Sequence, residues 1–343
     1  MIRVVIVDDS PTFRLLERSI LESDPGIQVV AEAINGHEAI RVCKRHQPDI
    51  ITMDIHMPGV DGYAAIQSIM SEMPCPIIVL TGTPESFNDK IHSKAIQSGA
   101  LTALPKPKDI QGIDPAADIL IEKIKSMSQV KVIRRKKLSQ PSVQSHSYSL
   151  QTSKNSIKIL GIGASTGGPP AIQKILSGLS TQIACPIVIV QHISQGFVQN
   201  LAKWLVSSTS FSVSLAVHAE RMIPGHVYIA QDSHHLTVTR EGRLYLNQTG
   251  PVDGHQPSVT VMFQSIAKEY GASSMGILLT GMGCDGASGL KQMADAGAMT
   301  IAQDEQSSVV FGMPKKAIEL GGARKIISIE EIACFVNQYT GIC

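Results

Sequence analysis

Aromatic residues are scarce in this chain of 343 residues, which has one Trp, six Tyr and seven Phe. Proteins that bind single-stranded nucleic acid stack its bases on aromatic side chains, so this scarcity argues against such a platform. No apolar run approaches the roughly 20 residues that a membrane-spanning helix needs. The apolar stretch at the N-terminus is too short for a cleavable signal and runs directly into two aspartates. We therefore expect a cytoplasmic protein with no nucleic-acid partner.

The six cysteines also lack a recognisable pattern. They form no C-x-x-C pair and no spacing typical of a metal site. Free thiols of this kind indicate a reducing compartment rather than a disulfide framework.

The chain has almost no net charge, because its 30 Lys and Arg residues balance 29 Asp and Glu. The distribution is uneven: residues 1–125 carry 12 basic and 17 acidic side chains, and residues 126–156 carry six basic and no acidic ones. The second stretch is rich in Ser and Gln and lacks apolar periodicity, which is typical of a flexible tether. At about 100–200 residues per domain, we expect a domain at 1–125, a basic flexible linker at 126–156 and a second domain at 157–343.

Short apolar strands alternate with helical patterns through residues 1–125. The expected strands are 3–7, 28–33, 50–53, 77–80 and 100–104, and the expected helices are 11–22, 36–46, 62–73, 89–98 and 116–127. Alternation at this spacing predicts a parallel sheet covered on both faces by helices, which is a flavodoxin-like (βα)5 fold.

Acidic residues gather at the ends of two of these strands. Asp8 and Asp9 end the first strand and Asp54 ends the third, and ligands of such sheets bind beyond the carboxyl ends of the strands. Crowded carboxylates are costly unless a hard cation shares the site, and oxygen ligands suit Mg²⁺. Thr81 closes the fourth strand and Lys106 follows the fifth. Together these groups predict phosphoryl transfer onto a carboxylate.

In the segments IVDDS, MDIHMPGVDG, LTG and GALTALPKP, these residues resemble the receiver domain of two-component response regulators over about residues 1–125. The resemblance implies that a histidine kinase supplies the phosphoryl group and that Asp54 accepts it. The other implied roles are Mg²⁺ binding by Asp8, Asp9 and Asp54, and phosphoryl contacts by Thr81 and Lys106. Where many receivers have an aromatic residue three positions before the lysine, this chain has Ala103, which leaves the route of signal transmission open.

Residues 157–343 again alternate strands and helices. Apolar strands are expected at 157–166, 186–192, 227–230, 235–239, 275–279 and 299–302, and helices at 171–179, 197–206, 258–270, 287–296 and 314–320. This pattern predicts a doubly wound, mainly parallel α/β domain with antiparallel additions around 227–247.

The glycine-rich turn after the first of these strands allows three interpretations. A dinucleotide site needs an acidic residue at the end of the next strand, but that strand ends in Gln191 and His192. The segment GASTG matches G-x-S-x-G, which presents a serine hydroxyl, here Ser165, on a tight strand-to-helix turn. The third interpretation is a tight turn whose serine caps the following helix. The turn alone leaves catalysis and capping open.

Two further residues favour catalysis. His192 lies just beyond the next strand, so the β-α-β unit brings it to the same rim as Ser165, and Asp285 lies in the loop TGMGCDGASG. A hydroxyl, an imidazole and a carboxylate are the parts of acyl-transfer catalysis, although the order along the chain differs from that of α/β-hydrolases. His255 is a rival base or substrate contact, and Cys284 is expected to be a buried thiol.

The segments GIGASTGGPPAI, IVIVQHISQGF, GHQPSV, LLTGMGCDGASG and IAQDEQSSVVFGMPKKAI resemble the protein-glutamate methylesterases of bacterial chemotaxis, the CheB family, from about residue 157 to the end. The resemblance implies that Ser165, His192 and Asp285 form a catalytic triad, with no metal in this domain. It implies hydrolysis of glutamyl methyl esters and deamidation of glutamines on the cytoplasmic domains of chemoreceptors. The protein would then meet the membrane only through those receptors.

The expected reaction also needs donors for an oxyanion. The backbone N–H groups of Thr166, Met282 and Gly283 are the candidates. Family precedent further implies that the unphosphorylated receiver covers the catalytic rim and that phosphorylation releases it.

Three other functions are less consistent with the sequence. A DNA-binding output domain would be small, basic and helical, whereas residues 157–343 are uncharged overall and strand-rich. A nicotinamide-dependent oxidoreductase would need an acid that binds the ribose, and this chain has none at the expected position. A receiver-controlled binding or relay protein without esterase activity is the remaining alternative.

Overall fold

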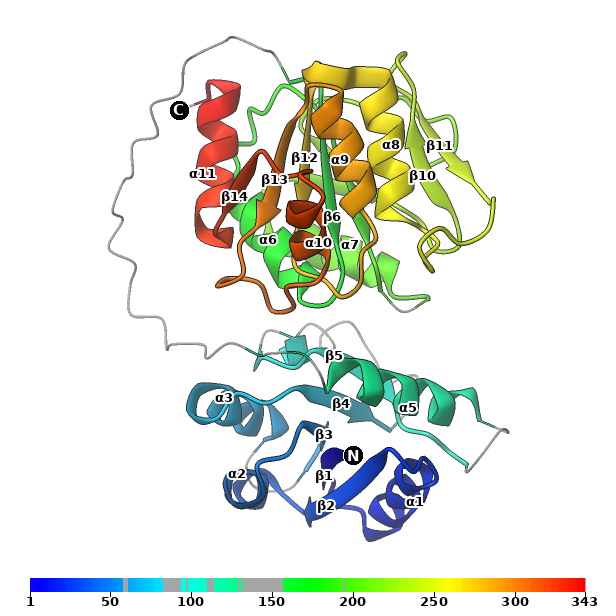
Figure 1. Cartoon of the computed structure of the whole chain (residues 1–343), viewed down its shortest axis with the longest axis vertical. Coiled ribbons are helices and arrows are strands. Elements are labelled where there is room, and N and C mark those ends of the chain that lie inside the picture. The colour runs from blue at the N-terminus through cyan, green and yellow to red at the C-terminus, as the bar shows by residue number, and fades with distance from the viewer. Residues whose placement is uncertain are drawn as a thin grey trace. The chain divides into compact units, whose positions relative to one another are not determined.

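The computed structural model describes residues 1–57, 61–82, 94–96, 98–109, 114–128, 130, 132, 157–193 and 195–342. The chain divides into two compact units, Met1–Val143 and Gln144–Cys343 (Figure 1). Most of the linker expected at 126–156, and most of the helix expected at 89–98, lie outside the described residues. The domain limits 1–125 and 157–343 therefore stay predictions.

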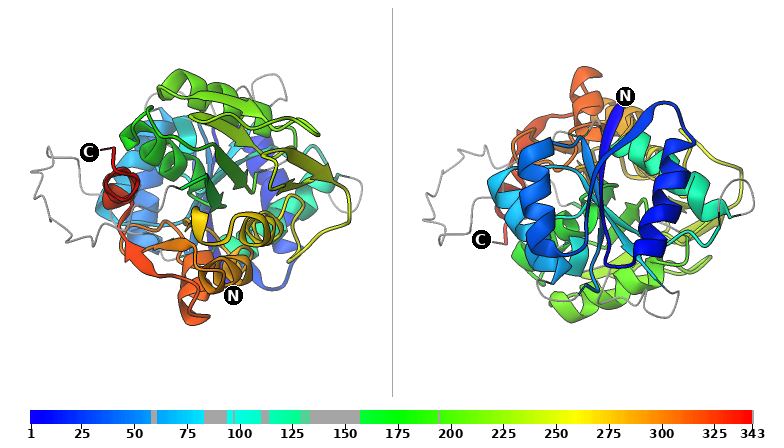
Figure 2. Two further views of the ribbon diagram at one scale, coloured as in Figure 1. Left: turned by 90° about the horizontal axis from the view of Figure 1, so that it is seen from above. Right: turned by 90° about the horizontal axis from the view of Figure 1, so that it is seen from below.

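The first unit contains a five-stranded parallel sheet in the order β2-β1-β3-β4-β5. Its strands are β1 (Ile2–Val7), β2 (Ile27–Ala33), β3 (Ile50–Asp54), β4 (Ile77–Thr81) and β5 (Thr102–Pro105), and its helices are α1 (Pro11–Glu22), α2 (Gly36–His46), α3 (Gly62–Glu72) and α5 (Pro115–Met127). Helices α1 and α5 cover one face and α2 and α3 the other (Figure 2). The central strands are buried on both faces, which is why most of their residues are apolar. The receiver-like fold is confirmed.

The second unit is built on a seven-stranded parallel sheet in the order β14-β13-β12-β6-β7-β9-β8. The strands are β6 (Ile159–Ala164), β7 (Ile187–Gln191), β8 (Ser212–Leu215), β9 (His226–Ile229), β12 (Ser274–Leu278), β13 (Met299–Gln303) and β14 (Lys325–Ile327). The helices are α6 (Gly168–Gly178), α7 (Val198–Ser208), α8 (Val259–Tyr270), α9 (Ala287–Asp295), α10 (Met313–Glu319) and α11 (Ile329–Thr340). The doubly wound α/β fold is confirmed.

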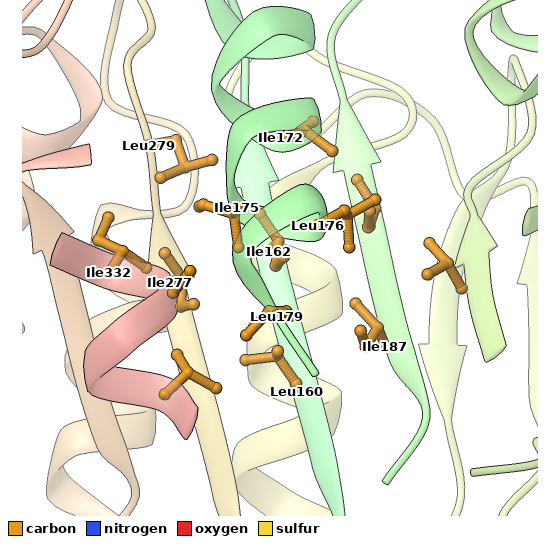
Figure 3. Packing of buried hydrophobic residues seen from close by; sticks show 14 of the residues in the cluster. Leu160, Ile162, Ile172, Ile175, Leu176, Leu179, Ile187, Ile277, Leu279 and Ile332 are labelled. Atoms are coloured by element: carbon orange, nitrogen blue, oxygen red, sulfur yellow. The ribbon is translucent and has the colours of Figure 1, made fainter. Parts of the chain in front are cut away.

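Alternate residues of the central strand enter two separate cores. Leu160 and Ile162 of β6 lie beside residues of α6 and α11 (Figure 3), in a core that also includes residues of α7. Ile159 packs with α8, α9 and α10 on the other face. The glycines between them allow α8 to approach closely. A Cβ on Gly161 would lie 2.7 Å from a methyl group of Ile266, and one on Gly163 would lie 2.2 Å from Val259. These glycines are therefore explained by helix packing and need no nucleotide.

The antiparallel part of the second unit differs in detail from the expectation. Strand β9 joins the main sheet in parallel, and the antiparallel pair is β10 (His235–Val238) with β11 (Leu244–Asn247). The sequence patterns also missed β8, β14 and α11. Both strands are short edge strands with exposed positions, so they lack the continuous apolar run that marks the buried strands.

A membrane-spanning element is not found within the described part of the chain, since none of its helices combines the necessary length and apolar character.

Candidate active site and phosphorylation site

Strands β1 and β3 bring the three predicted acidic residues of the first unit together. One carboxylate oxygen from each of Asp8, Asp9 and Asp54 lies within 4.8 Å of the others. Asp8 and Asp54 are buried, while Asp9 is exposed. Three converging carboxylates with one side open to solvent fit a hard divalent cation such as Mg²⁺, which binds oxygen ligands and keeps several waters.

Lys106 contacts two of these carboxylates. Its Nζ lies 2.7 Å from Asp54 Oδ2, 2.5 Å from Asp8 Oδ2 and 4.6 Å from the centre of the Phe13 ring. Burial lowers the pKa of Lys106, but hydrogen bonds to the two aspartates outweigh it and raise the pKa. Burial raises the pKa of Asp8, and the contact with Lys106 offsets only part of this. The charged lysine therefore neutralises part of the negative charge around Asp54.

Thr81, the remaining predicted residue of this site, ends β4 beside the end of β3. Asp54 pairs with Leu80 in the parallel register, and the backbone N–H of Lys106 donates to the Thr81 carbonyl oxygen over 2.8 Å. The Thr81 side chain is buried, and its Oγ1 has no hydrogen-bond partner among the residues described. All five predicted side chains of the site are thus placed at one edge of the sheet.

Sequence reasoning missed Glu17, a fully buried carboxyl group on α1. It shares the inner face of the helix with Ile20 and Leu21, and this spacing of three and four residues was the available signal. Burial, with a smaller contribution from the negative charge of Asp8, raises the pKa of Glu17 to about 8. Its Oε1 has no hydrogen-bond partner within the described chain. Glu17 is therefore protonated at neutral pH.

We expect Glu17→Gln to remove a pH dependence of stability. The pKa of Glu17 in the folded chain, about 8, exceeds the ordinary value of 4.5. At a pH between these two values, the folded chain therefore retains a proton that the unfolded chain has released. Glu17 therefore makes stability fall as pH rises from about 5 to about 8, at about 1.4 kcal/mol for each pKa unit.

This effect is measurable by urea-dependent proteolysis of the first unit in the full-length chain between pH 5 and pH 9. Trp204, the single tryptophan, lies in the second unit, so its fluorescence reports whether that unit is unaffected. The same pH dependence in the parent and in Glu17→Gln would contradict the prediction.

In the second unit, Ser165 and His192 leave two adjacent parallel strands at the same end. The register of β6 and β7 pairs Ala164 with Gln191, and each predicted residue follows directly. The backbone N–H of His192 donates to the Ala164 carbonyl oxygen over 2.9 Å. The buried Gln191 side chain donates from Nε2 to the carbonyl oxygens of Ser165 (2.8 Å) and His192 (2.7 Å). Gln191, which sequence reasoning had not assigned to the site, thus ties the two turns together.

Ser165 sits on a tight turn rather than at the cap of a helix. The N-cap residue of α6 is Gly167, with φ of +78° and no side-chain capping bond, so the helix-capping interpretation is wrong. Gly281 of a third segment packs against the serine, since a Cβ there would lie 2.8 Å from Ser165 Cβ. Only glycine fits at this approach, which places the 281–283 segment beside the hydroxyl.

His192 is joined to Asp285 through its Nε2, which lies 2.7 Å from Asp285 Oδ2. Both side chains are largely buried, and His192 Nδ1 has no hydrogen-bond partner among the described residues. When Nε2 carries the proton shared with Asp285, Nδ1 is the unprotonated acceptor. No hydrogen bond within the described structure joins Ser165 Oγ to this ring. Such bonds are often long until substrate binds.

Asp285 is held by the first turn of α8. It accepts hydrogen bonds from Ser258 Oγ (2.7 Å), Val259 N (2.7 Å) and Thr260 N (2.9 Å), in addition to His192. Burial alone raises its pKa, but the hydrogen bond and charge of His192, with the bonds from Thr260 and Ser258, bring the pKa down to about 2. Asp285 therefore remains a carboxylate at neutral pH.

Two protein-family models match the chain. The one described as CheB methylesterase matches residues 160–336, and the one described as response regulator receiver domain matches residues 4–118. This chain belongs to the CheB family. Members of this family are therefore the appropriate comparison for both units.

Two relatives are similar to this CheB chain over almost its whole length. A Nitrosospira multiformis protein named protein-glutamate methylesterase/protein-glutamine glutaminase is 42% identical and covers 98% of this chain and 97% of its own. One from Syntrophus aciditrophicus, with the same name and the number 1, is 42% identical and covers 99% of each. The crystal structure of the Thermotoga maritima CheB methylesterase catalytic domain is 34% identical, with a TM-score of 0.51, and covers 55% of this chain and 100% of that one.

The oxyanion candidates of the CheB chain lie in the turns on either side of Ser165. No hydrogen bond from the backbone N–H of Thr166, Met282 or Gly283 occurs within the parts of the chain that the structure describes. Met282 and Gly283 directly follow Gly281, which packs on the serine. These N–H groups are thus unengaged near the hydroxyl.

The prediction for Cys284 was wrong, because its side chain is exposed. Gly283 and Gly286 both have φ of +84°, so the loop turns sharply on each side of the pair Cys284-Asp285. Within this short loop the Asp285 side chain points into the protein, and the side chain of Cys284, the residue before it, points toward solvent.

His255 and His235, which also carry imidazoles, occupy different positions. The fully buried His235 accepts the Ser258 N–H at Nδ1 (3.1 Å) and lies 2.7 Å from the Gly250 carbonyl oxygen through Nε2, so it supports the residue that binds Asp285. His255 stacks on His192 with ring centroids 3.8 Å apart. Both stacked rings line a pocket of about 160 Å³.

Proposed function

We propose that this chain is a phosphorylation-regulated serine esterase. Its substrates would be glutamyl methyl esters and particular glutamines on the cytoplasmic domains of chemoreceptors. The observation that carries the proposal is the state of His192, whose Nε2 is bound to Asp285 while the buried Nδ1 is left without a partner in the described structure, one strand away from Ser165. An imidazole held in this way acts as a general base.

In the first half of the reaction, Ser165 Oγ attacks the ester carbonyl carbon while its proton passes to His192 Nδ1. The backbone N–H groups of Thr166, Met282 and Gly283 stabilise the negative charge that develops on the carbonyl oxygen. When the tetrahedral intermediate collapses, the bond to the methoxy oxygen breaks and His192 returns the proton to it. Methanol leaves and a glutamyl ester of Ser165 remains.

In the second half, water attacks the acyl-enzyme and gives a proton to His192. Collapse of this intermediate returns the proton to Ser165 Oγ and releases free glutamate on the receptor. With a glutamine substrate, the leaving group is nitrogen, which takes the proton from His192 and departs as ammonia. Asp285 stabilises the positive imidazole in each half, because it stays ionised.

For the first unit, we propose that Asp54 is the phosphate acceptor and that a histidine kinase is the donor. Asp8, Asp9 and Asp54 would hold Mg²⁺, which shields the charge of the phosphoryl oxygens when it is bound. Lys106, charged and 2.7 Å from Asp54, and the Thr81 hydroxyl would contact the phosphoryl group once it is transferred. The buried position of the Asp54 carboxylate favours a single orientation for attack.

Asp54→Asn is expected to abolish labelling by an acyl phosphate, because an amide lacks the nucleophilic oxygen. Removing Mg²⁺ with a chelator is expected to prevent labelling of the parent protein while basal methanol release continues. The matched control is Asp118→Asn, on the exposed side of α5, which should label normally. Labelling of Asp54→Asn at the parent rate would rule out this acceptor.

We also propose that the receiver restrains the esterase until Asp54 is phosphorylated, as family precedent suggests. The acidic balance of residues 1–125 and the basic stretch at 126–156 are compatible with a charge-dependent association. Deleting residues 1–125 is expected to raise the basal rate of methanol release. An unchanged or lower rate in the folded fragment would contradict restraint by the receiver.

The direct test of the proposed function is methanol release from methylated receptor membranes, with and without a phosphodonor. The esterase proposal predicts release that increases with the phosphodonor. A relay protein without esterase activity predicts no release under either condition. Because these receptors present their substrate helices in the cytoplasm, that compartment is the proposed location.

A further inference from the structure

His255 lies face to face with His192. The ring centroids are 3.8 Å apart and the ring planes differ by 11°. We propose that His255 is a positioning residue, which holds the plane of the His192 ring so that Nδ1 stays directed toward Ser165. This inference rests on the proposed function of Ser165 and His192.

The His192 ring needs a second constraint besides Asp285. Its polar contact within the described residues is the single bond from Nε2 to Asp285 Oδ2. Rotation about the bond between Cβ and the ring is soft for histidine, and a bond at one edge leaves the plane free to tilt about that contact. A tilt would change the direction of Nδ1, the ring nitrogen that is not bound to Asp285. A ring stacked on the face opposes this tilt by direct contact.

The segment that carries His255 is well anchored. Two backbone bonds of 3.0 Å pair Val252 with His255 in both directions. The carboxylate of Asp253 accepts a hydrogen bond of 2.9 Å from Thr260 Oγ1, and the same Oγ1 accepts one of 2.7 Å from Gly286 N. The stacking ring is therefore tied to the start of α8 and to the loop beside Asp285.

This anchoring connects the two supports of His192. The Thr260 side chain holds the 252–255 segment, and the Thr260 backbone N–H donates to Asp285 Oδ1 over 2.9 Å. One helix terminus thus positions both the carboxylate at the edge of the catalytic ring and the imidazole on its face. A contact fixed in this way can hold the geometry through both halves of the reaction.

The experiment compares His255→Leu with His255→Phe in the full-length protein. Leu removes the flat ring, and we expect kcat for methanol release to fall about 10-fold with KM within about 3-fold of the parent. Phe retains a flat ring without nitrogens, and we expect kcat to recover to within about 3-fold of the parent. His218→Leu is the matched control. That histidine packs edge-on against Tyr245, with centroids 5.1 Å apart, and does not line the pocket.

If His255 acts through its nitrogens, as a base or as a substrate contact, Phe will be as slow as Leu, and the positioning role is overturned. A large rise in KM with unchanged kcat would overturn it as well. A second readout is the proton NMR signal of the His192 Nε2–H. We expect this signal to exchange faster with water in His255→Leu and to be preserved in His255→Phe. An unchanged signal in His255→Leu would contradict the stack as a support.

Ser165→Ala separates failure of this inference from failure of the proposed function. If Ser165→Ala loses activity while His255→Leu keeps the parent kcat, the esterase proposal stands and the positioning role is wrong. If folded Ser165→Ala keeps near-parent activity, the proposed function itself is wrong.

Discussion

Ser165→Ala is expected to abolish methanol release, with a loss of at least about 10³-fold in kcat. The substitution removes the only atom that forms the acyl-enzyme in the proposed reaction. It should cost little stability, because Ser165 Oγ makes no hydrogen bond within the described structure and the turn is held by backbone bonds and by Gln191. The measurement is methanol release from methylated receptor membranes at saturating phosphodonor.

The control for this prediction is another serine on the same strand-helix unit. Ser177 lies on the exposed side of α6, and Ser177→Ala should release methanol at the parent rate. Circular dichroism and the fluorescence of Trp204 should show that both variants are folded. A folded Ser165→Ala protein with near-parent activity would exclude Ser165 as the nucleophile.

Asp285→Asn is the second substitution with a large expected effect, about 10³- to 10⁴-fold in kcat. The carboxylate accepts four hydrogen bonds, from His192, Ser258, Val259 and Thr260. An amide presents one oxygen, so at least one of these buried donors would face an NH₂ group. The amide also favours the wrong tautomer of His192, in which Nδ1 carries the proton and cannot accept one from the serine.

This substitution should also change the response of the second unit to acid. The pKa of Asp285 is lowered to about 2 from an ordinary value of 3.8. Its contribution to stability is therefore present above about pH 4 and is lost as pH falls toward 2. Urea unfolding followed by Trp204 fluorescence should show this loss in the parent and not in Asp285→Asn, whose stability is lower at pH 7.

A surface aspartate provides the control for Asp285→Asn. Asp295 pairs with Lys291 on the exposed side of α9, and Asp295→Asn should retain the parent kcat and acid response. Parent-like activity in a folded Asp285→Asn protein would remove the carboxylate from the mechanism.

The sequence predicted the buried parts of both folds well, and the reason is physical. Central strands such as β3 and β7 are buried along their whole length, so they are made mostly of apolar residues and end at a polar one. The candidate site residues lie at these ends: Asp54 is the last residue of β3, and His192 directly follows β7. Short edge strands such as β8 leave no comparable signal, because none of the four positions of β8 is fully buried.

The support of the site could not be predicted, because it depends on contacts between distant segments. In the sequence, Gln191 stands where a dinucleotide site would need an acid, and no other role could be assigned to it. In the structure its amide bridges the two turns of the active site. Ser258 lies 27 positions from Asp285 in the chain and donates to it. Which imidazole nitrogen of His192 faces the carboxylate also depends on the fold. Spacing along the chain contains none of this information.

The most direct test of convergence at Ser165 is acid quench of the reaction followed by mass spectrometry of the peptides. During turnover of a methylated receptor, we expect to find the peptide that contains Ser165 joined by an ester bond to a receptor peptide, through the side chain of its glutamate. No such adduct should form in Ser165→Ala. The adduct should form much more slowly in Asp285→Asn. Turnover without an adduct on Ser165, or an adduct on the exposed Cys284 instead, would contradict the proposed mechanism.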